Sequence, residues 1–201
     1  MSHAPLSFSR AEPSLMGMPH AAEKWTAARV RALPDDGRRY ELVSGELLVT
    51  PAPRPRHQLA LAALYDRLAP YLAETGLGRL LWSPADLALG EDEVLQPDLF
   101  VVPGRETQSL RAWTDVTALL LVIEVVSPST AHYDRQLKRL RYQRAGVPEY
   151  WIVDPDARII ERWRPADTRP EVLSEVMEWI PKSGVAPLQL DLKEFFAAIC
   201  E

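Results

Sequence analysis

Cysteine is almost absent from this sequence: Cys200 is the only one among 201 residues. That count excludes an intramolecular disulfide and a cysteine-based zinc site, and it is typical of a protein of the reducing cytoplasm, where we expect this chain. The four histidines are too widely spaced to favour a histidine-rich metal site. The glycines form neither a phosphate-binding loop nor a dinucleotide-binding fingerprint.

Long apolar runs are also missing. No stretch is long and apolar enough to span a membrane, and the N-terminus lacks the apolar run of a secretory signal, so we expect neither a membrane partner nor export. The net charge of −5 gives no global attraction to nucleic acid, although a local basic patch can still contact a few phosphates. We expect residues 1–22, which are polar and contain several prolines, to be a disordered tail, and residues 23–201 to form a single domain.

Hydrophobic periodicity predicts helices and strands that alternate along this domain. Helices are expected over 26–33, 57–74 and 134–145, hairpins over 40–50 and 149–164, and single strands over 79–83, 86–89, 99–102 and 118–126. The last segment, 184–199, is expected to be an extended piece followed by a short helix. Because helices and strands interleave and hairpins are mixed in, the sequence predicts an α/β fold with a mixed central sheet flanked by helices.

One carboxylate, Glu124, stands inside the apolar run 118–126, which ends at Ser127-Pro128. Such a run is typical of a strand that is buried on both faces of a sheet. An ionised carboxylate in that position is strongly unfavourable unless a cation pairs with it. A hard divalent cation would offset the lost hydration, and a buried ion pair with Lys138 is the alternative.

Two further acids are candidates for the same site. Asp98 immediately precedes the apolar strand 99–102, a position at a sheet edge where it can meet Glu124 from a neighbouring strand; a plain turn aspartate is the alternative. Mg²⁺ typically takes one or two protein carboxylates, and this pair meets that requirement. Glu41, in the first hairpin, faces opposite to its two apolar neighbours and is either a third acid of the site or a solvated strand residue.

The helix expected over 134–145 is locally basic. Asp134 is its one acid, against Arg135, Lys138, Arg139, Arg141 and Arg144. Such a run is commonly a solvated helix face, whereas the functional interpretation is a surface that faces phosphates. Lys138 and Tyr142 share a face one turn apart, and Asp134 either caps the helix or pairs with Lys138. His57, at the start of the long helix, is a candidate for a phosphate contact or a proton transfer, or is simply solvated.

Several segments together resemble the Uma2 family of restriction-endonuclease-like proteins. Taken in order they are "YELVSGEL", "RHQ", "QPDLFVV", "VIEVVSPST", "DRQLKRLRYQRAGVPEYWIVDP" and "LQLDLKEFF". The likeness runs from about residue 25 to the C-terminus, and "IEVVSPST" followed by "GVPEYWIVDP" is its most specific part. It implies the fold of the PD-(D/E)xK nuclease superfamily, a restriction-endonuclease-like mixed sheet flanked by helices.

The resemblance also implies roles for individual residues. Asp98 would be the acid of the "PD" element and Glu124 that of "(D/E)xK", and both would bind Mg²⁺, or Mn²⁺ in its place, to activate a water against a DNA phosphate. The lysine expected two residues after Glu124 is replaced by Val126, and Lys138 would take its place. Glu41 would be an additional catalytic acid. The candidates for contacts with substrate phosphate are His57, Arg135 and Tyr142.

Three functions stay open at this point. The first is a metal-dependent endonuclease that hydrolyses DNA, acting as a homodimer because an enzyme that cuts both strands benefits from two sites. The second is a nuclease fold without activity that serves as a dimeric interaction or structural module, an interpretation that the displaced lysine favours. The third is a glycoside hydrolase with Asp98 and Glu124 as paired acids, which is disfavoured because Trp151 and Trp163 lie in apolar hairpin patterns.

Overall fold

A six-stranded mixed sheet forms the centre of the structure, a computed structural model that describes residues 24–200 apart from 35, 51, 91–92 and 129. The tail expected over 1–22 lies outside the described residues. The strands, in their order across the sheet, are β3 (Gly78–Trp82), β4 (Leu99–Pro103), β5 (Leu121–Val125), β6 (Tyr150–Asp154), β7 (Ile159–Trp163) and β8 (Glu171–Leu173). Neighbouring strands are antiparallel except β5 and β6, which are parallel. The predicted mixed α/β fold is therefore confirmed.

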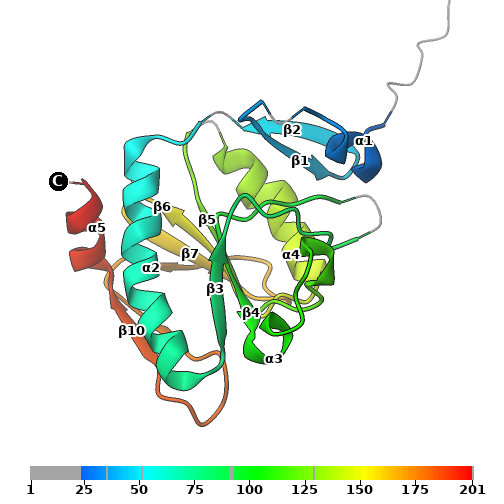
Figure 1. Cartoon of the computed structure of the whole chain (residues 1–201). Coiled ribbons are helices and arrows are strands. Elements are labelled where there is room, and N and C mark those ends of the chain that lie inside the picture. The colour runs from blue at the N-terminus through cyan, green and yellow to red at the C-terminus, as the bar shows by residue number, and fades with distance from the viewer. Residues whose placement is uncertain (1–23, 35, 51, 91–92, 129, 201) are drawn as a thin grey trace, which may run out of the picture.

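The neighbouring interior strands β4 and β5 are buried at every residue, because helices cover both faces of the sheet. Figure 1 shows α2 (Pro55–Thr75) and α5 (Leu192–Cys200) on one side of the sheet and α4 (Arg139–Arg144) on the other. Ile123 and Val125 belong to the core beneath α2, whereas Val122 belongs to the core beneath α4. Since side chains alternate along a strand, Glu124 points to the α4 side.

The long helix α2 follows its hydrophobic pattern. Pro55 occupies its first turn, where a missing N–H is tolerated, and Gly76 ends it in the left-handed conformation at φ 64°. The residues that it buries against the sheet recur every fourth position: Ala60, Leu64, Leu68 and Leu72. The apolar spacing thus fixes which face of α2 meets the sheet, and with it the direction of His57 in the first turn.

A separate hairpin covers the α4 side of the sheet. Its strands are β1 (Arg39–Val43) and β2 (Glu46–Thr50), joined by a tight turn at Ser44 and Gly45 in which both residues have positive φ, the geometry of a hairpin turn that matches strand twist. The short helix α1 (Ala27–Arg31) precedes it, capped by Thr26. Leu42 exchanges backbone hydrogen bonds with Val94, which ties the hairpin to the loop before β4.

Some elements differ from the expectation. Residues 86–89 make only an isolated bridge, Leu87 to Leu95, in the part of the chain that the structure describes. The helix after β5 begins as a π-helical turn, η2 (Tyr133–Lys138), which is wider than an α-helical turn. Four short elements were not expected: α3 (Gly104–Thr107), the 3₁₀ turn η1 (Trp113–Asp115), β8 and β9 (Val176–Trp179), the last paired with β10 (Leu188–Asp191). No helix among the described residues is long and apolar enough to cross a bilayer.

We expect Leu64→Ala to lower the free energy of unfolding by about 2–5 kcal/mol, because Leu64 is fully buried and its removal leaves a cavity under α2. Leu59→Ala is the matched control on the same helix, since Leu59 is 53% exposed, and it should leave the urea midpoint nearly unchanged. Equal losses in the two variants would contradict this assignment of the buried face.

Candidate active site

Asp98 and Glu124 lie side by side on neighbouring strands. The antiparallel register pairs Leu99 with Ile123, which sets the preceding Asp98 opposite the following Glu124. Asp98 Oδ2 accepts a hydrogen bond from the Val125 backbone N–H at 2.8 Å. Asp98 is 4% exposed and Glu124 2% exposed, so two carboxylates share a nearly dry position on the α4 side of the sheet.

Lys138, the last residue of η2, neutralises part of this charge. Its ammonium Nζ lies 2.9 Å from Glu41 Oε2, 3.1 Å from Glu124 Oε1 and 3.2 Å from Asp134 Oδ1. An ammonium has three donors, and each of them meets a carboxylate here. The structure therefore brings Glu41, Glu124 and Lys138 together, and it adds Asp134, which pairs with Lys138 from four residues away.

Arg39 is a second cation at the site, and the sequence analysis did not identify it. Its Nη1 donates to Asp98 Oδ1 at 2.6 Å, while Nη2 lies 3.5 Å from Glu124 Oε2 and Nε lies 3.6 Å from Glu41 Oε2. Nε and Nη2 are buried and have no hydrogen-bond partner among the described residues. The only signal in the sequence is that Arg39 is two positions from Glu41 and so shares its strand face.

The three candidates for phosphate contacts have different surroundings. His57 Nε2 lies 3.0 Å from Asp98 Oδ2, which places the imidazole at the carboxylates. Tyr142 is fully buried and its hydroxyl donates to Glu124 Oε1 at 3.1 Å. Arg135 instead donates to Asp154 and Glu161, at 2.8 and 2.6 Å. The structure thus places His57 in contact with Asp98 and Tyr142 in contact with Glu124. Arg135 pairs with two other acids instead.

Burial and charge shift the two central carboxyl groups in opposite directions. Burial raises the pKa of Glu124 well above its usual range, and the nearby charge of Lys138 only partly opposes that effect. Burial also raises the pKa of Asp98, but the hydrogen bond to His57 and the charge of Arg39 outweigh it and hold the pKa below its usual range. Neighbouring acids whose pKa values are driven apart are typical of catalytic sites.

A cavity of about 1060 Å³ opens beside these residues, between the hairpin and the first turn of α2. Its walls include Arg39, Glu41, His57, Asp98 and Lys138. The carboxylates are therefore reached from a space large enough for part of a polymeric substrate, while the sheet closes the site from behind.

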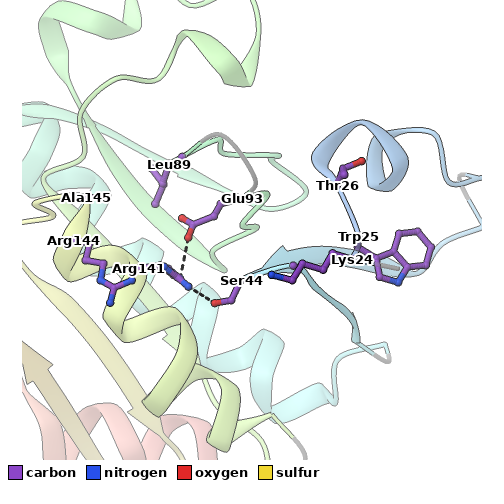
Figure 2. Close-up of a pocket in the computed structure, with 11 residues that line it drawn as sticks. Lys24, Trp25, Thr26, Ser44, Leu89, Glu93, Arg141, Arg144 and Ala145 are labelled. Carbon is purple, nitrogen blue, oxygen red and sulfur yellow. Dashed lines mark hydrogen bonds and ion pairs between the residues drawn. The ribbon is translucent and has the colours of Figure 1, made fainter. Parts of the chain in front are cut away.

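A smaller cavity, of about 430 Å³, lies between the hairpin turn and the C-terminal end of α4 (Figure 2). Arg141 enters it and pairs with Glu93 at 2.9 Å and with the Ser44 hydroxyl. Its charged lining is Lys24, Arg141 and Arg144 with the single carboxylate of Glu93, which is no metal-binding set, so we place the candidate site in the larger cavity.

The oxygen donors of Asp98 and Glu124 suit a hard divalent ion that keeps most of its waters. The charge balance suits it too: the buried acids are Glu41, Asp98, Glu124 and Asp134, and the cations that pair with them are Arg39 and Lys138. Within the described residues, however, no group of three or more His, Cys, Asp or Glu side chains is arranged to hold a metal. An ion here would thus rely on Asp98 and Glu124 with water completing its shell.

Two comparisons with known proteins found a match. A family model described as "Uma2: Putative restriction endonuclease" matches residues 27–193. A crystal structure described as "a putative nuclease belonging to DUF820", from Anabaena variabilis, is 18% identical in sequence, covers 87% of this chain and 99% of that chain, and superposes with a TM-score of 0.72. At that identity the likeness shows a shared fold. No curated protein matches the chain.

Removing the buried ammonium should destabilise the protein in a pH-dependent way. We expect Lys138→Met to lower the free energy of unfolding at pH 7.5 by about 3–5 kcal/mol, because three buried carboxylates lose their shared cation. A buried carboxyl group whose folded-state pKa is raised favours the folded state at low pH, and that contribution is lost as the pH rises through the raised pKa. The deficit of the variant should therefore shrink between pH 7.5 and pH 5, as urea unfolding at both values will measure.

Lys193→Met is the matched control, since Lys193 also pairs with a glutamate at 2.8 Å but with its side chain 71% exposed. It should unfold like the wild type at both pH values. A Lys138→Met protein as stable as the wild type at pH 7.5 would contradict the ionised, buried cluster.

Proposed function

This chain belongs to the Uma2 family, and on that premise we propose that it is a metal-dependent endonuclease that hydrolyses DNA phosphodiester bonds. The observation that carries the proposal is the juxtaposition of Asp98, which lines a large cavity, and Glu124, which is buried beside it; the pKa values of the two carboxyl groups are shifted in opposite directions. A nuclease needs such a cluster where a phosphodiester can enter, and the cavity leads to it.

In this proposal Asp98 and Glu124 would hold Mg²⁺, or Mn²⁺ in its place. When bound, the ion would supply a water of lowered pKa and would stabilise the charge that develops on the phosphate. The chain contributes the arrangement around it. Val125 fixes Asp98 through its backbone N–H, and Tyr142 fixes Glu124 through its hydroxyl. Both acids are thereby held in one orientation before substrate arrives.

Lys138 fills the role of the lysine that is missing two residues after Glu124. Val126 in that position is buried in the core beneath α4 and brings no charge. Lys138 comes from η2 instead, lines the cavity, and keeps Glu41 and Glu124 in place while presenting a positive charge to the phosphate. His57, which also lines the cavity, contacts a phosphate or exchanges a proton with Asp98. We propose DNA as the substrate, the cytoplasm as the location of the protein and a homodimer as the acting form.

The second candidate function is an inactive nuclease fold that acts as a dimeric interaction module. One observation favours it: Arg39 and Lys138 already give every buried carboxylate of the site a cationic partner. A protein that kept these acids only for structure would look the same in the absence of metal. Divalent-ion-dependent cleavage separates the two functions.

We expect the purified protein to nick or cut DNA in the presence of Mg²⁺ or Mn²⁺ and to stop when EDTA is added. Asp98→Asn and Glu124→Gln should each lower the cleavage rate by about 100-fold or more, because a metal site contributes several kcal/mol to the transition state. Supercoiled plasmid, linear duplex and single-stranded DNA, with RNA as a comparison, provide the assay.

Glu175→Gln is the control, since this exposed acid pairs with Lys193 and neither residue lines the cavity, and it should cleave like the wild type. Cleavage that survives EDTA, or that survives the loss of either central acid, would overturn the proposed mechanism. Metal binding without cleavage of any of these substrates would favour the inactive interaction module.

A further inference from the structure

We propose that Arg39 is a displaceable counter-ion: it neutralises Asp98 and Glu124 while no metal is bound and leaves them when a divalent cation binds. The inference rests on the proposed metal site, and it assigns to Arg39 a role that metal ligands do not have. Arg39 is a positioning residue that sets how tightly the site binds metal.

The two cations of the cluster are held very differently. Lys138 places its ammonium within 3.2 Å of three carboxylates, and its side chain is 5% exposed. Arg39 makes one short contact, to Asp98 at 2.6 Å, and its contacts to Glu41 and Glu124 are longer than hydrogen bonds, at 3.6 and 3.5 Å. Lys138 is therefore fixed by three short ion pairs, whereas Arg39 is fixed by one short ion pair, to Asp98.

The unsatisfied nitrogens of Arg39 point to the same conclusion. Nε and Nη2 are buried, yet neither has a hydrogen-bond partner among the residues that the structure describes. Leaving a buried donor of a charged group unpaired is unfavourable, so the guanidinium gains hydration when it moves into water. A side chain that served only to neutralise these acids would be expected to satisfy its donors, as Lys138 does.

Arg39 and a metal would compete for the same atoms. The guanidinium lies against one oxygen of Asp98 and one of Glu124, the two groups proposed as metal ligands. A divalent cation bound there would place like charges within a few ångströms of each other in a poorly solvated site, which disfavours both staying. Binding of the ion therefore requires the guanidinium to withdraw.

The structure provides room for that withdrawal. Arg39 is the first residue of β1, lines the 1060 Å³ cavity, and has a side chain that is 20% exposed. Its stem can turn toward the cavity without moving the strand. Lys138 has no such freedom, because η2 and three carboxylates enclose its ammonium.

Calorimetric titration with Mn²⁺ at pH 8, where protons compete least for the carboxylates, tests the inference. Arg39→Gln should bind Mn²⁺ at least tenfold more tightly than the wild type, because the ion no longer has to displace a cation. Without metal the same variant should melt at a lower temperature than the wild type, and Mn²⁺ should raise its melting temperature by more. Arg38→Gln is the control, since Arg38 is an exposed neighbour paired with Asp36, and it should behave as the wild type in both measurements.

A second readout uses the wild-type protein, so the test does not depend on the folding of a variant. The side-chain Nε–H signal of Arg39 in a nitrogen-15 NMR spectrum, assigned by its loss in Arg39→Lys, should shift and exchange faster with water when Mg²⁺ is added. A signal that Mg²⁺ leaves unchanged while calorimetry shows the ion bound would overturn the inference.

The outcomes separate this inference from the function on which it rests. Mn²⁺ binding to the wild type with unchanged or weaker affinity in Arg39→Gln would overturn the role of Arg39 and leave the metal-dependent nuclease standing. Binding by neither protein would overturn both. Binding that appears only in Arg39→Gln would overturn the displacement as well, because Arg39 would then block the site and would not leave it.

Discussion

Four buried carboxylates on one face of the central sheet have to be neutralised by nearby cations, and several elements of the fold are arranged so that this can happen. Each acid comes from a different element: Glu41 from β1, Asp98 from the entry to β4, Glu124 from β5 and Asp134 from η2. Lys138 connects three of them through one ammonium, and Arg39 spans the remaining gap to Asp98. The hairpin is fastened to the loop before β4 through Leu42 and Val94, which keeps Arg39 and Glu41 against the sheet. An isolated acid in any of these positions would be strongly unfavourable.

The two cations of the cluster, Lys138 and Arg39, differ in how firmly they are held. Lys138 is enclosed and pairs with three carboxylates, so it belongs to the folded framework. Arg39 makes a single short ion pair, to Asp98, and lines the large cavity. In the proposal its guanidinium can therefore move away from the carboxylates when an ion binds. In the proposed mechanism, a site built in this way is stable without the ion and still binds it.

The part of the site that could be predicted from the sequence is the part with a local signature. Glu124 stands out because it interrupts the buried strand β5, and Asp98 because it immediately precedes the apolar strand β4. The antiparallel pairing of β4 with β5 then sets the two acids opposite each other. The sequence does not decide whether Glu41 belongs to the site or points to solvent, since the sequence of a hairpin does not show what covers it. Arg39 is not recognisable from the sequence because Asp98, its one short contact, is 59 residues away. The π-helical conformation of η2 places Asp134 and Lys138 in the same cluster of charged side chains. This conformation likewise depends on packing rather than on local sequence.

A crystal structure of the protein soaked in Mn²⁺, with the anomalous signal of the ion recorded, tests the central claim most directly. We expect one anomalous peak about 2 Å from carboxylate oxygens of both Asp98 and Glu124, with the guanidinium of Arg39 turned into the cavity and Lys138 unmoved. The absence of a peak between these two carboxylates at saturating Mn²⁺, or a peak held by other residues with Arg39 still in place, would contradict it.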